Sequence, residues 1–222
     1  MPRGSLWRRI VRRFHPEGIP WPGSAVYDAL SRSRIFLRHY DLVADDIARA
    51  CGGGRILDVG TGPARLLLAL RGRLPGAVLA GVDISPAMVA KARENVGAAG
   101  IEVREGSAGE LPFPEGSFDA VVSTGSMHHW KEPVAALDEA HRVLRAGGIA
   151  LMYDLVRKMP RDVAEGIRRE FGAFRLALLW VHSFEEPFYD PAEMVALAAR
   201  SRFRSGGVRF VGALCGLVLE KA

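Results

Sequence analysis

Two acidic residues and two glycines stand at the ends of apolar segments, in a spacing that suits a nucleoside ligand. Asp58 closely precedes a turn that contains Gly60 and Gly62. Asp83 ends a second apolar segment at residues 77–82. The glycines permit a tight turn and a close approach of the backbone to a ligand. A carboxylate at the end of the second strand can accept hydrogen bonds from both hydroxyls of a ribose, which predicts a pocket for an adenosine-type cofactor.

The turn departs from the glycine pattern of dinucleotide-binding proteins. The third glycine of G-x-G-x-x-G would fall at position 65, where this chain has an arginine. Nothing small stands there to let a pyrophosphate and a helix pack closely, and the carboxylate of Asp58 disfavours an anionic group. A cationic or amino-bearing ligand is therefore expected, with a nicotinamide-dependent oxidoreductase as an alternative.

The elements that must position these residues follow from the apolar spacing. Helical segments alternate with strands predicted near residues 55–60, 77–83, 101–106, 118–124 and 148–154. Alternation of this kind predicts an α/β fold with a Rossmann-like, doubly wound parallel sheet. The first helix is expected to begin at Pro63, since a missing N–H costs nothing in the first turn. Ligands bind such sheets outside the carboxyl ends of the strands, where these polar residues fall: Asp58, Asp83, Ser107, Thr124 and Asp154.

The segments on either side of this core are also predominantly helical. Residues 24–50 carry apolar residues at helical intervals, and residues 155–186 lengthen the connection after the fifth strand. Asp190 is the expected N-cap of the last helix, with Pro191 and Glu193 completing a capping-box pattern. Two further strands are predicted near residues 203–210 and 213–220.

Length and composition indicate a single domain. The chain has 222 residues, of which 49% are hydrophobic and 25% are charged, enough for a full core without disulfides or metals. Cys51 and Cys215 support neither a disulfide framework nor a metal cluster, so no metal site is expected and a reducing cytoplasm is the simplest location. No apolar segment approaches the roughly 20 residues of a membrane span.

The positive charge is concentrated in an N-terminal arm. The net charge is +5, and five arginines precede the first acidic residue, Glu17, which leaves 25 basic against 25 acidic residues. This distribution disfavours nucleic acid as a partner, because a nucleic-acid binder spreads basic residues along its binding face. Residues 6–14 form a basic amphipathic pattern with a tryptophan. We expect this helix to pack onto its own domain, with peripheral contact to an anionic membrane as the alternative.

An ordered set of motifs resembles one enzyme family over roughly residues 40–154. The motifs are RILDVGTG at 55–62, GVDISPAM at 81–88, ELPFPEGSFDAVV at 110–122, MHHW at 127–130 and EAHRVLRAGG at 139–148. The set resembles the class I S-adenosylmethionine-dependent methyltransferases, in the small-molecule group that includes the ubiquinone and menaquinone biosynthesis enzymes. The resemblance implies a seven-stranded, mostly parallel sheet that ends in an antiparallel C-terminal hairpin.

The resemblance also implies a division of the chain. Residues 1–50 would form an N-terminal helical arm and cap, and residues 51–154 the cofactor-binding core. Residues 155–186 would form a helical lid, and residues 187–222 the last helix and the hairpin. The expected function is methyl transfer from S-adenosyl-L-methionine to a small or lipid-like acceptor, with S-adenosyl-L-homocysteine as product. The alternative is a non-catalytic cofactor-binding or regulatory module of the same fold.

Residue roles in the cofactor pocket follow from the matching positions. Asp58 would lie near the methionine ammonium group, Asp83 would hold the ribose hydroxyls and Ile84 would pack on adenine. Relatives usually have Asp-Ala where this chain has Ser107 and Ala108, and a neutral hydroxyl in place of the carboxylate weakens cofactor binding by about 1 kcal/mol. The remaining expected cofactor-binding residues are Gly60, Thr61, Gly62, Ser123 and Thr124.

The chemistry requires little of the side chains. A sulfonium methyl group is already activated, so alignment and exclusion of water supply most of the rate, and a base helps only where the acceptor must lose a proton. His128 and His129 follow the fourth strand and are the candidates for that base, although either can be a structural histidine. The expected substrate pocket comprises Tyr27, Tyr40, Trp130, Tyr153 and His182.

Overall fold

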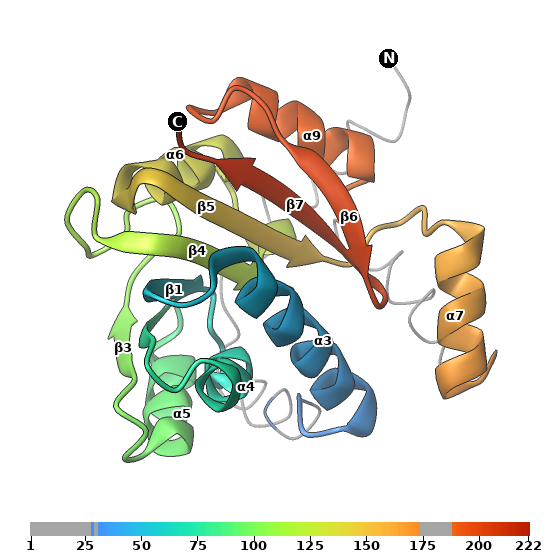
Figure 1. Cartoon of the computed structure of the whole chain (residues 1–222), viewed down its shortest axis with the longest axis horizontal. Helices are drawn as coiled ribbons and strands as arrows, with labels where there is room; N and C mark the ends of the chain where they lie inside the picture. The colour runs from blue at the N-terminus through green and yellow to red at the C-terminus, as the bar shows by residue number, and fades with distance from the viewer. Residues whose placement is uncertain (1–27, 29–30, 174–187) are drawn as a thin grey trace.

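A seven-stranded sheet forms the centre of the computed structural model, which describes residue 28, residues 31–173 and residues 188–222. Its strand order is β3-β2-β1-β4-β5-β7-β6 (Figure 1). The first five strands are parallel, and β7 runs antiparallel to both β5 and β6. The predicted mostly parallel sheet with an antiparallel C-terminal hairpin is thus confirmed. The strands are β1 (Arg55–Val59), β2 (Val78–Asp83), β3 (Glu102–Glu105), β4 (Phe118–Thr124), β5 (Leu144–Asp154), β6 (Gly207–Val211) and β7 (Leu214–Glu220).

Helices cover both faces of the sheet and divide the core into two layers (Figure 1). One layer packs α3 (Arg34–Cys51), α4 (Arg65–Arg73) and α5 (Pro86–Val96) against the sheet. The other packs α6 (Pro133–Val143) and α9 (Pro191–Arg200) against the opposite face. Helix α7 (Arg161–Phe171) lies in the connection between β5 and α9, and a 3-10 turn, η1 (Met127–His129), follows β4.

The parallel register brings the ends of the central strands to one edge. Asp58 pairs with Gly81 across β1 and β2, and Asp58 pairs with Val122 across β1 and β4. The backbone N–H groups of Gly60 and Thr61 both donate to the carbonyl oxygen of Val82, at 2.8 and 3.0 Å. Because these bonds fix the turn to the end of β2, the turn after β1 and the carboxylate that ends β2 must lie close together.

A glycine in β2 makes room for that turn. A Cβ atom added at Gly81 would lie 2.8 Å from Cδ1 of Leu67 and 2.9 Å from Cγ2 of Thr61. Such distances are shorter than normal van der Waals contacts, so any larger residue would push α4 and the turn away from the sheet. The absent side chain therefore helps to set the position of the turn.

The start of α4 differs from the sequence-based prediction. The helix begins at Arg65 rather than Pro63, because Ala64 has a φ of 62° and its N–H donates to the carbonyl oxygen of Thr61 at 2.9 Å. Pro63 thus lies inside a tight turn. A left-handed alanine costs on the order of 1 kcal/mol, a cost that helical periodicity does not reveal.

Other boundaries also moved, while the capping box of the last helix is confirmed. Helix α3 begins at Arg34, within the segment predicted as helical at residues 24–50, and β5 begins at Leu144, four residues before the predicted start at residue 148. Strand β6 begins at Gly207 because the Arg204 N–H donates to Ser201 O at 3.1 Å in a preceding turn. At α9 the Glu193 carboxylate accepts from the backbone N–H of Asp190 at 2.9 Å, as the capping pattern predicts.

Some predictions fall outside the described residues. These include the amphipathic arm at residues 6–14 and most of the apolar part of residues 155–186, so the division of the chain into arm, core, lid and hairpin stays a prediction.

Within residues 31–173 and 188–222, no helix has the length and apolar character needed to cross a lipid bilayer.

Candidate functional site

A cavity of about 500 Å³ opens at the carboxyl ends of β1, β2 and β4. Its walls come from the turn after β1, the loops after β2, β3 and β4, and the first part of α6. This is the edge at which doubly wound sheets bind ligands. Nine of the expected cofactor-binding residues line it, namely Asp58, Gly60, Thr61, Gly62, Asp83, Ile84, Ser107, Ala108 and Thr124.

The glycine turn forms one wall of the cavity, and its backbone conformation favours glycine at two positions. Gly60 and Gly62 have φ values of 72° and 51°, in the left-handed region that favours glycine. A Cβ atom at Gly60 would overlap Oγ and Cβ of Ser126, a residue of the loop after β4. The turn therefore places the backbone of Gly60 against the side chain of Ser126 beside the cavity.

Asp83 is a buried carboxylate whose two oxygens both accept backbone hydrogen bonds. Oδ2 accepts from Gly62 N at 2.8 Å and Oδ1 from Ser85 N at 2.9 Å. Burial raises the pKa of Asp83, although these two N–H donors act in the opposite direction. Each carboxylate oxygen has a second lone pair, so Asp83 can still accept two hydrogen bonds from a ligand.

Asp58 is more deeply buried and less well satisfied. Its side chain is only 2% exposed, and Oδ2 accepts from the hydroxyl of Thr61 at 2.8 Å. Oδ1 is buried and has no hydrogen-bond partner among the described residues. Burial, together with the nearby negative charge of Asp83, raises the pKa of Asp58 to about 7. The site therefore offers an unsatisfied acceptor that a cationic donor would fill.

The residues expected beside the adenine also line the cavity, together with the acidic Glu110. Ser107 and Ala108 line it after β3, and Ser107 Oγ accepts from Gly109 N at 3.2 Å. Ile84 lines the same space and is 37% exposed. Ser123 is buried in β4 and is not among the described lining residues, whereas its neighbour Thr124 is. Adjacent strand residues point to opposite faces, which explains the difference.

The two candidate histidines occupy different positions. His129 lines the cavity, but His128 is 5% exposed and is not among the lining residues in the described ranges. The Nδ1 atom of His128 lies 2.9 Å from Oδ2 of Asp154, and the two imidazole rings lie 3.9 Å apart. The histidine pair therefore connects a buried carboxylate at the end of β5 with the cavity.

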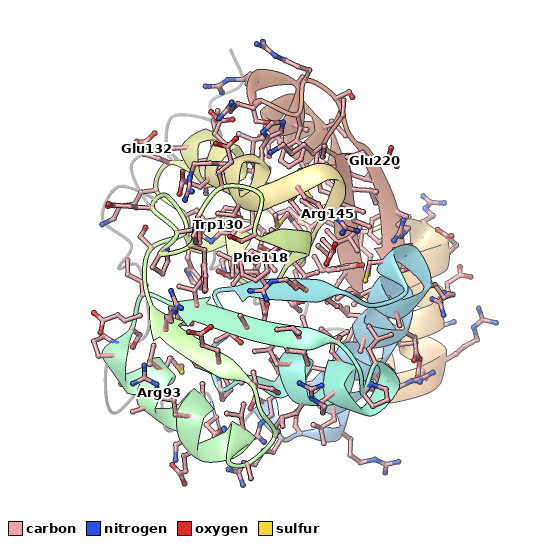
Figure 2. The ribbon with its side chains drawn as sticks, turned by 60° about the vertical axis from the view of Figure 1, so that its left-hand side comes forward. Arg93, Phe118, Trp130, Glu132, Arg145 and Glu220 are labelled. Atoms are coloured by element: carbon pink, nitrogen blue, oxygen red, sulfur yellow. The ribbon has the colours of Figure 1, made fainter. Side chains whose placement is uncertain are left out.

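The predicted substrate-pocket residues also separate. Tyr40 and Trp130 line the cavity, and the Trp130 indole donates to Ser126 Oγ at 3.0 Å. Figure 2 shows Trp130 on the loop after β4, with Glu132 at the start of α6. Tyr27 and His182 lie outside the described residues.

Tyr153 belongs to a structural cluster instead. It is 1% exposed, and its hydroxyl donates to Oδ2 of Asp46 in α3 at 2.6 Å. Arg209 of β6 donates to the same oxygen at 2.7 Å. Burial and the Asp46 carboxylate raise the pKa of Tyr153 far above its usual range. The cluster joins α3, β5 and β6, and Tyr153 is absent from the cavity lining.

Several lining residues were missed by the sequence analysis. Met88 follows β2 at a helical interval and is buried at the cavity wall, a position that α5 periodicity could have indicated. Ser126, Lys131 and Glu132 line the cavity from the segment after β4, where no periodic pattern identifies them. Arg65, at the position of the missing third glycine, donates to Asp28 at 2.7 Å.

Comparison with known proteins assigns the chain to a family. Residues 57–152 match the model of a methyltransferase domain. The demethylmenaquinone methyltransferase of Thermus thermophilus is 44% identical over 197 residues, which cover 80% of this chain and 89% of that protein. This chain belongs to the class I S-adenosylmethionine-dependent methyltransferases.

A plant relative matches over a shorter part of its length, and a solved structure matches over nearly all of its chain. The rice 2-methyl-6-phytyl-1,4-hydroquinone methyltransferase 2 is 41% identical over 98 residues, 44% of this chain but only 28% of the rice protein. A solved methyltransferase structure from Aquifex aeolicus superposes with a TM-score of 0.70 at 21% identity, covering 90% of this chain and 98% of that one. The structural likeness supports the fold, and the family match favours an active methyltransferase over a non-catalytic module.

The cofactor of this methyltransferase is S-adenosyl-L-methionine, and the cavity residues fit it. The unsatisfied Oδ1 of Asp58 matches an ammonium group, and the spare lone pairs of Asp83 match two ribose hydroxyls. Within the described ranges no cluster of three or more His, Cys, Asp or Glu side chains could hold a metal ion.

The substitution Tyr153→Phe tests the structural assignment of Tyr153. Losing one buried hydrogen bond to Asp46 should lower the free energy of unfolding by about 1–2 kcal/mol. The KM values should stay within about twofold of wild type, because the hydroxyl lies outside the cavity. Urea denaturation and steady-state kinetics check both parts, and a large rise in KM at unchanged stability would contradict the assignment.

The substitution Asp58→Asn tests the unsatisfied carboxylate. The pKa of Asp58 rises from 3.8 to about 7 in the folded protein. Between these two pH values the native state therefore binds more protons than the unfolded state. The free energy of unfolding falls as the pH rises through this window. Asp58→Asn should raise the unfolding temperature of the free protein by about 4 °C or more at pH 8, with little change near pH 4.

The same variant should bind the cofactor more weakly. At pH 8 the affinity for S-adenosyl-L-homocysteine, measured by calorimetry, should fall at least about tenfold, because a charge-assisted hydrogen bond is lost. Glu105→Gln is the matched control, since Glu105 pairs with Asp83 in the sheet, is exposed and does not belong to the described cavity lining. Wild-type affinity in Asp58→Asn would rule out this carboxylate as a ligand contact.

Proposed function

We propose that this methyltransferase transfers the methyl group of S-adenosyl-L-methionine to a ring carbon of a lipid-tailed hydroquinone. The observation that carries the proposal is the similarity to a demethylmenaquinone methyltransferase. This chain is 44% identical to that protein over an aligned segment that covers 89% of that protein's length. The rice relative, named for a phytyl-hydroquinone acceptor, supports the same acceptor class. The first name contains a quinone, which becomes a hydroquinone on reduction, and the second contains a hydroquinone. A hydroquinone ring carries nucleophilic carbon.

The proposed cofactor contacts follow the cavity geometry. Asp58 binds the ammonium group, Asp83 binds the ribose hydroxyls, and the turn at Gly60–Gly62 bends around the methionine part. Ile84, Ser107 and Ala108 surround the adenine. Thr124 lies at the end of β4 between cofactor and acceptor, and Ser123 supports it from within the sheet.

The acceptor would occupy the part of the cavity between α3 and the loop after β4. Tyr40 and Trp130 supply aromatic walls there, and His129 is the titratable histidine that lines the same space. Bound S-adenosyl-L-methionine supplies an activated methyl group. The protein aligns the acceptor carbon with that group and excludes water, which is where most of the rate enhancement of such a transfer arises.

A methylation assay tests the acceptor class. The purified protein should transfer labelled methyl groups to a short-chain menaquinone precursor in its reduced hydroquinone form and not to the oxidised quinone, because only the hydroquinone ring is nucleophilic. Mass spectrometry should locate the methyl group on carbon. Product from neither form, in a protein that binds S-adenosyl-L-homocysteine, would reject the hydroquinone acceptor.

The cofactor contacts need a separate variant. Asp83→Asn should weaken S-adenosyl-L-homocysteine binding at least about tenfold, because an amide nitrogen cannot accept from a ribose hydroxyl. Glu105→Gln makes the same charge change on the neighbouring strand and should bind normally. Equal affinity of both variants would contradict the ribose assignment.

We further propose that residues 6–14 bring the enzyme to a membrane surface, where a lipid-tailed acceptor resides. The basic amphipathic pattern supports this location, while packing of the segment onto its own domain is the alternative. Full-length protein should co-sediment with anionic vesicles more strongly than a variant lacking residues 1–15. Equal, negligible sedimentation of both proteins would support packing onto the domain.

A further inference from the structure

A buried aspartate at the end of β5 holds the 3-10 turn that carries both histidines. Oδ2 of Asp154 accepts from the backbone N–H of His128 at 3.0 Å and lies 2.9 Å from its Nδ1 atom. Oδ1 lies 3.0 Å from the same Nδ1 and accepts from Leu155 N at 2.9 Å. Asp154 is 1% exposed. One carboxylate therefore fixes both the backbone and the ring of His128.

These contacts determine which nitrogen of the His128 ring carries its proton. A carboxylate only accepts hydrogen bonds, so Nδ1 must donate. The ring is held from two further directions, because the Phe188 ring lies 4.2 Å away and the His129 ring 3.9 Å away, centroid to centroid. With its donor bonded and both neighbours packed, His128 has one orientation.

His129 is the member of this group that reaches the cavity. Its ring contacts the fixed ring of His128 and lines the space shared with Trp130 and Thr124. The order from inside to outside is thus Asp154, His128, His129 and then the proposed acceptor. A residue that must meet a reacting group within hydrogen-bond reach needs this kind of support.

We propose that His129 takes the hydroxyl proton of the hydroquinone acceptor, and that Asp154 and His128 are its positioning residues. The inference rests on the proposed function above. It separates the two histidines by role, because only His129 touches the substrate. It also adds Asp154, which contacts neither substrate nor cofactor.

The step balances without any further reagent. The acceptor O–H bond breaks and its proton moves to a ring nitrogen of His129. The oxygen electron pair raises electron density at the ring carbon, which forms a bond to the methyl carbon. The methyl–sulfur bond breaks and its electron pair stays on sulfur, giving a neutral thioether. Loss of the proton from the methylated ring carbon to solvent restores the aromatic ring as a phenolate. His129 then returns its proton to that oxygen, which gives the methylated hydroquinone and regenerates the neutral imidazole.

The test compares variants on two acceptors that differ in acidity. His129→Gln should lower kcat about 100-fold on an ordinary hydroquinone, with the affinity for S-adenosyl-L-homocysteine unchanged. Asp154→Asn should lower kcat at least about tenfold, with KM within about twofold of wild type. On an electron-poor hydroquinone that is already ionised at the assay pH, both losses should shrink to about threefold or less, because no proton needs to be removed.

A measurement independent of turnover accompanies the kinetics. In wild type, a downfield proton resonance bound to ¹⁵N should report the Nδ1–H of His128, and Asp154→Asn should abolish it. Asp138→Asn is the control, since Asp138 accepts a backbone hydrogen bond from Arg202 but lies on α6, apart from the cavity lining in the described ranges. It should retain wild-type kcat and the resonance.

Three results would overturn the inference: wild-type kcat in His129→Gln, equal losses on both acceptors, or persistence of the His128 resonance in Asp154→Asn. Equal losses would mean that these residues act on the fold of the loop and not on proton removal. Failure of the wild-type enzyme to methylate any hydroquinone would instead reject the proposed function, which keeps the two failures distinct.

Discussion

Two carboxylates brought together by adjacent parallel strands are the constraint on which the site depends. The pairing of β1 with β2 sets Asp58 against Gly81, and the turn after β1 then hydrogen-bonds to Asp83. Both side chains are less than a tenth exposed. Burial and mutual repulsion disfavour their ionised forms, so the free protein carries an electrostatic cost that a positively charged ligand would relieve. The charge of such a pocket disfavours anionic nucleotides, whatever the fit between the shapes of ligand and pocket.

The backbone around these carboxylates is held in a conformation that the chain would not adopt locally. Gly60 fits against Ser126 only because it has no side chain, and Ala64 takes a left-handed conformation beside it. Asn95 donates to the Pro63 carbonyl oxygen at 3.0 Å, and Arg65 pairs with the buried Asp28. Contacts from α5 and from the segment before α3 thus stabilise a strained turn, as is common where a backbone must approach a ligand closely.

Much of this arrangement could be predicted from sequence, because it depends on local patterns. Apolar strands followed by Asp58 and Asp83, with glycines between, specify a ligand edge once the strands are parallel. Long-range contacts carry no such pattern. Nothing near Tyr153 in sequence indicates that Asp46 and Arg209 would surround its hydroxyl. Likewise, the sequence does not indicate which of the two adjacent histidines contacts Asp154. The contact between His128 and Asp154 joins the ends of two different strands, which are far apart in the sequence.

The most direct test of the charge constraint is a titration of the Asp58 carboxyl carbon by ¹³C NMR, assigned with Asp58→Asn. In the free methyltransferase this carboxyl should titrate with a pKa of about 7, raised from 3.8. Saturation with S-adenosyl-L-homocysteine, which brings an ammonium group, should lower that pKa markedly, whereas methylthioadenosine, which has none, should not. A carboxyl that titrates near 3.8 in the free protein, or one whose pKa does not respond to the ammonium ligand, would contradict the account.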